Sequence, residues 1–380
     1  MNFKIKAEDF QKLGNDVMKG YVKSDKTVLA MKVSKTLLKI LCYSPSTYFE
    51  GKVKIMDVED LDDSWKILDG DGFKSFLSIL PKDDTIINFS TTTLGDFVLK
   101  YGRNKVNLNL KEIIDDTPIK EERNFIEIAD VDAVSFMTTL KDMSKIVSKD
   151  KNKEHSSLSF LHMFFNEDNI TMMATQSISI AEFIYKIDSP KIVDDYVLLK
   201  GNFIDLLDTT LTVNDTWTLI KTKSKFGYKN NNGFIALIAI ASDDIKPIKY
   251  THLKNLTAKK EDLDYNSIII NSISLKDTLA NIFKISPNDP SAVFHFTKEG
   301  LFLETPFGDK FEVESNYSQD KDVKFGVNKE ALKCLYSIWS PNIEMIFKDD
   351  VFRNVIEFKI LDGQDNILDN IFIGVSPDDQ

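Results

Sequence analysis

Arginine is almost absent from this chain, which has 48 basic residues but only Arg103, Arg123 and Arg353 as arginines. Lysine therefore carries nearly all of the positive charge. A lysine ammonium meets a phosphate as a hydrated point charge, without the bidentate grip of a guanidinium group. This bias is typical of an AT-rich genome, and it also suits a protein that contacts phosphates loosely.

Cysteine and long apolar runs are scarce as well. Cys42 and Cys334 both stand in apolar stretches, which is typical of buried free thiols rather than of a disulfide or a metal pair. No apolar run reaches the roughly 18 residues that a membrane span needs. The first residues, "MNFKIKAEDF", lack the apolar block of a signal peptide. We therefore expect a cytoplasmic protein without membrane contact.

Residues that would support catalysis are also missing. The four histidines lie at His155, His162, His252 and His295. They lack the spacing of a metal site, and no glycine-rich phosphate loop follows a strand. Adjacent carboxylates such as Asp62 and Asp63 point to opposite faces of a strand or lie in a loop. We expect no enzyme, no cofactor and no metal, and keep a hydrolase as the weakest alternative.

Acidic residues outnumber the basic ones, and 59 acids against 48 bases give a formal net charge of −11. At first sight this acidity argues against a nucleic-acid partner. A basic stripe on one face of an acidic body still attracts a polyanion, because the local field decides where it binds. The length of 380 residues predicts two or three domains, each with its own core.

A strand that runs directly into a helix occurs six times along the sequence. One form of this junction is "WKILDGDGFKSFLSILP", "YVLLKGNFIDLLDTTL" and "VKFGVNKEALKCLYSIW". The other is "FKIKAEDFQKLGNDVMKGY", "FIEIADVDAVSFMTTLKDMSKIV" and "SIIINSISLKDTLANIF". In each, alternating apolar residues give way to apolar residues at helical spacing. Phe73, Phe203 and Ala331 are equivalent, at intervals of 130 and 128 residues, so the period has the size of a domain.

The segments between these junctions are predicted to be short strands in hairpins, as in "TIINFS", "NITMMAT" and "GFIALIAI". The repeating unit is therefore β-α-β-β-β, which predicts an α+β fold with antiparallel sheets and two helices per pair of units. Neighbouring sheets are expected to pair at their edges, which otherwise invite aggregation. Polar linkers near 114–123 and 253–265 predict domains at 1–120, 121–255 and 256–380.

Over essentially its whole length the sequence resembles the bacterial-type DNA sliding clamps, the DNA polymerase III beta subunit family. The best local matches are "YGRNKVNLNL", "ITMMATQS", and "FGVNKEALKCL" followed by "NIEMIFKDD". The resemblance implies three clamp domains per chain and a homodimer ring closed head to tail, with sheets outside and helices lining the hole. It implies a processivity factor for DNA replication that encircles double-stranded DNA without sequence preference and tethers a DNA polymerase. The lysine usage would suit a phage-encoded protein or a low-GC bacterium.

If helices line a hole, their polar faces should carry lysines that contact DNA. Lys141, Lys145 and Lys149 are spaced so that they share one helical stripe, and the loop that follows matches a family loop that touches DNA. The predicted DNA-binding residues are Lys12, Lys19, Lys23, Lys74, Lys141, Lys145, Lys149, Lys151, Lys153, Lys276, Lys284, Lys329 and Lys333. The fourth helix breaks the pattern with Asp205 and Asp208. A solvated helix face explains any one of these lysines equally well.

The resemblance also implies a pocket, between domains two and three, for peptide motifs of the polymerase and the clamp loader. By position, its residues are Thr175, Ser177, Ile178, Ile180, Pro247, Ile248, Tyr250, Ile373 and Val375. Here "TQSISI" replaces the family's usual Gly-His-Arg after the threonine, and the tail "SPDDQ" is acidic, so the partner peptides are expected to differ.

At the expected subunit interface, Val106 and Leu108 match the edge strand of domain one, and Phe283 and Ile285 match the facing helix end of domain three. Ordinary strand or helix core is the other interpretation of these four residues.

A structural β-rich assembly protein, of the kind found in virions, is the main alternative function. It would explain the repeats but not the lysines on the predicted helices. A closed dimer is expected of a clamp and a larger or open array of a shell protein. A monomeric processivity factor is a third possibility.

Overall fold

The computed structural model describes most of the chain. The described residues are 2–24, 26–59, 64–92, 96–108, 110–112, 124–147, 157–176, 179–188, 190–193, 195–209, 215–247, 259–262, 265–289, 291–317, 322–337, 340–348, 355–361 and 367–374. None of the helices formed by these residues is long and apolar enough to cross a membrane. The chain divides into two compact units. Unit 1 takes Met1–Thr138, Ile187–Ile192 and Phe203–Ile240, and unit 2 takes Thr139–Lys186, Val193–Asn202 and Ala241–Gln380.

Unit 1 holds two antiparallel sheets and the helices α1 (Ala7–Met18) and α2 (Gly70–Ile79). The five-stranded sheet has the order β5 (Met56–Glu59), β1 (Asn2–Lys6), β7 (Ile86–Thr91), β8 (Phe97–Tyr101) and β9 (Asn104–Leu108). The nine-stranded sheet has the order β10 (Leu110–Glu112), β6 (Lys66–Leu68), β2 (Val28–Val33), β3 (Leu37–Tyr43), β4 (Thr47–Lys54), β18 (Ile235–Ala239), β17 (Lys225–Asn230), β16 (Thr216–Lys221) and β11 (Ile126–Asp132).

Unit 2 also holds two antiparallel sheets, together with α7 (Ser272–Ile285) and α8 (Lys329–Leu332). The eight-stranded sheet has the order β15 (Asp195–Lys200), β12 (Phe160–Phe165), β13 (Asn169–Gln176), β14 (Ser179–Lys186), β26 (Ile367–Gly374), β25 (Val355–Leu361), β24 (Asn342–Lys348) and β19 (Tyr265–Asn271). The four-stranded sheet has the order β22 (Lys310–Val313), β21 (Gly300–Glu304), β20 (Ser291–Thr297) and β23 (Val323–Asn328). The helices α4 (Ala133–Ile146) and α5 (Gly201–Ile204) contain residues of both units.

All six predicted junctions are present, because β1, β6, β11, β15, β19 and β23 each lead into a helix. Three strands follow each of the last four helices, as predicted, whereas the short strands β5 and β10 each add a fourth after α1 and α2. The predicted α+β fold of repeated β-α-β-β-β units is confirmed. Two helices are shorter than their patterns indicate. The last is α-helical only to Leu332 and continues as a 3-10 helix over Lys333–Ser337, and α5 continues likewise over Asp205–Leu207. A 3-10 turn is a common way for a short helix to end.

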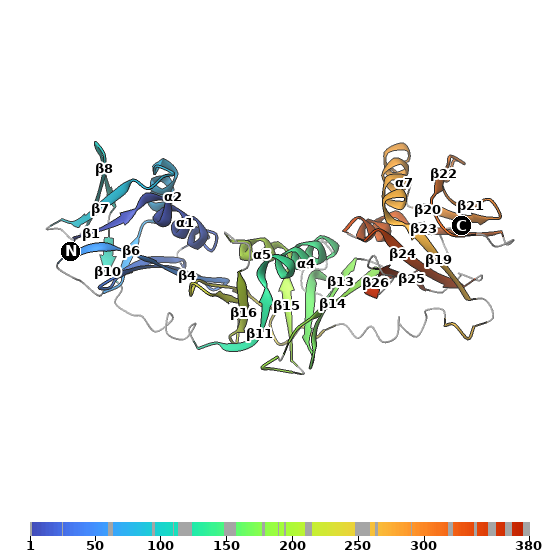
Figure 1. The fold of residues 1–380 in the computed structure, drawn as a ribbon, viewed down its shortest axis with the longest axis horizontal. Helices are drawn as coiled ribbons and strands as arrows, with labels where there is room; N and C mark the ends of the chain where they lie inside the picture. Colours follow the sequence, from blue (N-terminus) through green and yellow to red (C-terminus); the bar gives the residue numbers. More distant parts are fainter. Residues whose placement is uncertain are drawn as a thin grey trace. The chain divides into compact units, whose positions relative to one another are not determined.

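Phenylalanines connect α1 and α2 to the five-stranded sheet of unit 1. The Phe10 ring of α1 lies 5.8 Å from that of Phe73 on α2 and 5.3 Å from that of Phe89 on β7. The helices approach closely at Gly14, where an added Cβ would lie 2.6 Å from Leu77 Cδ2. Figure 1 shows α1 and α2 side by side. The helical spacing of the apolar residues therefore builds this core as the sequence predicts.

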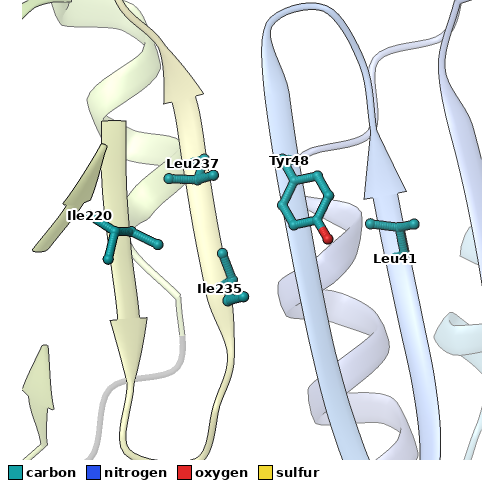
Figure 2. Packing of buried hydrophobic residues seen from close by; sticks show 5 residues of the cluster. All are labelled: Leu41, Tyr48, Ile220, Ile235 and Leu237. Carbon is teal, nitrogen blue, oxygen red and sulfur yellow. The ribbon is translucent and has the colours of Figure 1, made fainter. Parts of the chain in front are cut away.

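Edge strands of consecutive predicted domains pair with one another. In unit 1, β4 pairs with β18, and Tyr48 stands directly opposite Leu237. These two residues belong to a buried apolar cluster with Leu41, Ile220 and Ile235 (Figure 2). In unit 2, β14 pairs in the same way with β26. The predicted edge pairing is therefore present, and it leaves no open edge at these four strands.

The predicted domain boundaries at 120 and 255 fall at residues 113–123 and 248–258, which lie outside the described ranges. The division into domains 1–120, 121–255 and 256–380 therefore stays a prediction.

A polar network crosses the four-stranded sheet of unit 2. The carboxylate of Glu304 accepts from Lys324 Nζ and pairs with His295 Nδ1, both at 2.6 Å, while His295 Nε2 lies 2.9 Å from Asp322 Oδ1. Burial alone would raise the pKa of Glu304, but the hydrogen bonds from Lys324 and His295 outweigh it and hold this pKa below its ordinary value of 4.5. The ionised carboxylate therefore stabilises the fold above that value, and this contribution is lost as the pH falls through the lowered pKa.

We expect Glu304→Gln to lower the free energy of unfolding by about 1–3 kcal/mol near neutral pH, because hydrogen bonds to a charged group are lost. The difference from the wild type should begin to shrink as the pH falls below about 4.5, where the unfolded chain takes up the proton, and should reach its lowest value below the lowered pKa, where the folded wild-type carboxylate is also neutral. Urea unfolding across this pH range measures it. Glu299→Gln, at an exposed glutamate in the turn between β20 and β21, is the control. A difference that does not change with pH would contradict the assignment.

Candidate nucleic-acid and partner interfaces

The lysines of α1 and α2 differ in how free their charge is. Lys12 and Lys74 are exposed on their helices, whereas Lys19 is half-buried at the C-terminal cap of α1. Lys23 is exposed, but its ammonium lies 2.5 Å from a carboxylate oxygen of Asp71, in the first turn of α2. In unit 1, Lys12 and Lys74 are therefore the better candidates for contacts with phosphates.

On α4 and α7, acidic neighbours offset part of the lysine charge. Lys145 is exposed and pairs at 2.6 Å with Asp142 of the same helix. Lys276 of α7 is half-buried, and burial lowers the pKa of its ammonium although the Asp142 carboxylate opposes this shift. Lys141 is half-buried, and Lys284 is exposed at the C-terminal end of α7. Of these four lysines, Lys145 and Lys284 are exposed, and the salt bridge of Lys145 is weak because water screens it.

The structure contradicts the prediction that Lys329 binds DNA. Its side chain is buried, with a residue exposure of 4%, and its ammonium donates a hydrogen bond to the carbonyl oxygen of Ser286. An ammonium that points into the protein cannot meet a phosphate. Helical spacing did not predict the burial of Lys329, because this residue is the first of α8, where the chain leaves the sheet. Lys333, one turn further along, is exposed.

The predicted stripe on α4 is shorter than expected, because the helix ends at Ile146. Lys149, Lys151 and Lys153 lie outside the described residues, and their role stays a prediction.

Two residues of the predicted partner pocket share one face of the eight-stranded sheet. Thr175 of β13 stands directly opposite Ile180 of β14, and both are buried. Ile373 of β26 stands opposite Ser179 instead, so it points to the other face, and its exposure is 0%. Ile373 is therefore a core residue of this sheet, and we remove it from the pocket. Pro247 is half-buried. Ser177, Ile178, Ile248, Tyr250 and Val375 lie outside the described residues.

The predicted subunit-interface residues lie on β9 of unit 1 and on α7 of unit 2. The strand β9 is the last of its sheet, and Val106 and Leu108 pair with the core residues Leu99 and Phe97. Leu108 is buried and Val106 is half-buried, so the outer edge of this strand, which none of the described strands covers, is what it offers a partner rather than these side chains. On α7, Phe283 is half-buried and Ile285 is 53% exposed.

An exposed aromatic residue that the sequence analysis missed lies beside an edge strand of unit 2. Phe307 is 79% exposed in the turn between β21 and β22, and β22 is one of the two outer strands of its sheet. The turn is closed by a hydrogen bond of 3.0 Å from the Gly308 amide to the Thr305 carbonyl, and Gly308 has a φ of 94°. Pro306 and Gly308 flank Phe307 with turn-forming residues, and this pattern could have identified it.

Within the part of the chain that the structure describes, no group of three or more His, Cys, Asp or Glu side chains is placed to hold a metal ion. The thiols of Cys42 and Cys334 are buried and free, and burial raises the pKa of each to about 12. Neither thiol is therefore a nucleophile at neutral pH.

Comparisons with known proteins identify the fold. No protein-family model matches the sequence, and no curated protein matches it. Solved structures do match. The DNA polymerase III subunit beta of Pseudomonas aeruginosa superposes with a TM-score of 0.80 at 14% identity, over 99% of both chains. The chain has the sliding-clamp fold. The beta subunit of Streptococcus pyogenes gives a TM-score of 0.77 at 14% identity over 99% of both chains, and that of Thermotoga maritima gives 0.75 at 15% over 98% of both.

Removing the side chain of Ile373 tests its placement in the core. We expect Ile373→Ala to lower the free energy of unfolding by about 2–5 kcal/mol, and the control Ile373→Val to lower it by about 0.5–1.5 kcal/mol, because the cavity grows with the volume that is removed. Urea unfolding measures both. If the two variants cost the same small amount, Ile373 is not part of the sheet core.

Proposed function

We propose that this protein is a DNA sliding clamp, a processivity factor that encircles duplex DNA and tethers the replicative polymerase without catalysing a reaction itself. The observation that carries the proposal is the match of nearly the whole chain to solved clamps, with TM-scores of 0.75–0.80 over 98–99% of both chains. The six repeated strand-to-helix junctions agree with it.

A ring of two chains would have a hole of suitable size. Six junctions in each of two chains give twelve helices, and at about 8–10 Å spacing these make a circle roughly 30–38 Å across at the helix axes. A helix radius of about 5 Å on each side leaves roughly 20–28 Å. Such an opening admits a nucleic-acid duplex without gripping it.

Weak lysine contacts suit a protein that slides. Each phosphate that a lysine neutralises releases counterions, which gives an attraction that does not depend on base sequence and that salt weakens. The exposed lysines Lys12, Lys23, Lys74, Lys145, Lys284 and Lys333 are the proposed contacts among the described residues. The salt bridges of Lys23 and Lys145 are weak because both ammoniums face water, so a phosphate can replace the carboxylate. A solvated ammonium holds no fixed geometry, so it can pass from one phosphate to the next.

Charge reversal at Lys141, Lys145 and Lys149 should lower the affinity for duplex DNA by about tenfold or more and make it less sensitive to salt, because phosphate contacts are lost. Fluorescence anisotropy with labelled duplex over a series of salt concentrations measures both effects. The matched control reverses Lys52, Lys54 and Lys186, which are exposed on strands of the two large sheets. DNA binding equal to that of the control would remove the α4 lysines from the interface.

Partner proteins would bind unit 2. We propose that polymerase and clamp loader peptides dock near Thr175, Ile180 and Pro247, with Ser177, Ile178, Ile248, Tyr250 and Val375 as further members of the pocket. Apolar side chains with a polar rim are the usual anchor for such peptides.

Two copies of the chain would close the ring at their free strand edges. The strands β9 and β22 each end a sheet, so their outer backbone groups can pair with another strand. Ile285 and Phe307 add exposed apolar side chains on unit 2. In a homodimer, one β9 edge can meet one β22 edge at each of two contacts, and the outer backbone groups of both strands then have partners.

The assembly can be tested directly by sedimentation and by imaging. We expect the purified chain to sediment at twice its mass of 43.4 kDa and to appear in micrographs as a ring with a central opening. Ile285→Glu should shift it to the monomer, because a carboxylate in an apolar contact is costly. Ile273→Glu, at a residue 65% exposed at the other end of α7, is the control. Large or open arrays of the wild type would favour the virion-type alternative instead.

A further inference from the structure

A buried lysine lies behind the exposed C-terminal end of α7. The helix ends at Ile285, and the cap residue Ser286 donates its amide to the Ile282 carbonyl at 2.9 Å. The chain then turns within a few residues, where the Asp289 amide donates to the Ser286 carbonyl at 3.3 Å. This turn leads into β20, which begins at Ser291.

Strand pairing brings Lys329 to this turn. The first residue of β20, Ser291, stands opposite Asn328, the last residue of β23. Lys329 follows Asn328 directly, so its side chain starts next to the turn that joins α7 to β20. Its ammonium donates a hydrogen bond to the Ser286 carbonyl and lies 6.0 Å from the centre of the Phe283 ring. One cation therefore meets the residues on both sides of Ile285.

The contacts of Lys329 are those that fix a helix end. Carbonyl groups at a helix C-terminus lack partners within the helix and carry the negative end of its dipole, so a cation is favourable there. A cation over an aromatic ring adds an attraction that is stronger away from water. Burial lowers the pKa of Lys329, and the Asp289 carboxylate opposes this shift. Ser286 Oγ and Asp289 Oδ2 are buried and have no hydrogen-bond partner among the residues that the structure describes, so the attraction between the ammonium and this carboxylate is a charge interaction rather than a hydrogen bond.

We propose that Lys329 is a positioning residue for ring closure: it holds the end of α7 in the orientation in which Phe283 and Ile285 meet a second copy of the chain. This inference rests on the proposed function, since it takes that end of α7 as a subunit contact. It separates Lys329 from the exposed lysines, whose charge acts on DNA. Lys329 acts within the protein.

A double-mutant cycle with Ile285→Ala tests whether Lys329 acts through the helix end. Lys329→Met keeps the length of the side chain and removes the cation, and we expect it to raise the dimer dissociation constant by about tenfold, as does Ile285→Ala. In the combined variant, the dissociation constant should rise by at least about threefold less than the product of the two single increases, because the effects of residues that act together are not additive. Sedimentation at several concentrations gives the constants.

Hydrogen exchange of the backbone amides of Ser286 and Asp289, measured in the Ile285→Glu background that is expected to be monomeric, supplies a readout that does not depend on dimerisation. Lys329→Met should speed exchange at these amides by about tenfold or more, because the turn is less often closed. The control is Lys298→Met, which removes an exposed lysine from the turn between β20 and β21 of the same unit, and it should change neither exchange nor the dimer. If Lys329→Met does not fold, Lys329→Gln takes its place, since it keeps a polar donor and lacks the charge.

The outcomes separate the two proposals. If the wild type is monomeric, or Ile285→Ala leaves the dimer unchanged, the proposed ring contact is wrong, and the inference fails with it. Lys329 does not position the contact if Ile285→Ala weakens the dimer while the Lys329 variant leaves the dissociation constant unchanged. The same conclusion follows if the dissociation constant of the combined variant rises by the full product of the two single increases. Unchanged exchange at Ser286 and Asp289 would overturn the positioning role by itself.

Discussion

The pairing of β4 with β18 is the constraint on which the architecture of unit 1 depends. Each β-α-β-β-β repeat ends on a strand whose outer edge has unpaired backbone groups, and such an edge is a hazard unless another strand covers it. Here the edge of one repeat covers that of another, with Tyr48 opposite Leu237 in a buried cluster. In unit 2, β14 and β26 satisfy the same requirement. Duplication of the repeat thus supplies both the edge and its partner, whereas β9 and β22 remain at the ends of their sheets.

Much of this fold was predictable from the sequence, because the apolar period changes from two to about 3.6 at each junction. The position of each junction follows from that change, whereas the additional strands β5 and β10 do not. The apolar period does not predict which strands pair with one another. The prediction that neighbouring sheets pair at their edges came from the cost of open edges, and the register within each pair was not predicted. Ile373 shows the consequence: one residue of register decides which face of the sheet a side chain joins.

The candidate sites were predicted less completely, for a physical reason. Helical spacing says which residues share a face, but not whether that face meets solvent or another strand. Lys329 was assigned to a solvent face by its place in a repeat, yet the pairing of β20 with β23 turns it towards Ser286. Phe307 is the opposite case. An aromatic residue next to a strand is usually predicted to lie in the core, but here the turn between β21 and β22 exposes it to solvent.

The lysines therefore form two classes, those with a buried ammonium and those with an exposed one, and the difference between them has a thermodynamic basis. A buried ammonium must be compensated by fixed groups, such as the Ser286 carbonyl and the Asp289 carboxylate, and so it is held in one geometry. An exposed ammonium, such as that of Lys12 or Lys74, is compensated by water and mobile ions, so it keeps its freedom. Rigid placement suits a contact between two protein surfaces, where complementarity must be maintained. Freedom suits a contact with a polyanion that moves past the protein, where a fixed geometry would hold the polymer in place. The scarcity of arginine is consistent with the second requirement, because a bidentate guanidinium–phosphate pair is the more directional of the two.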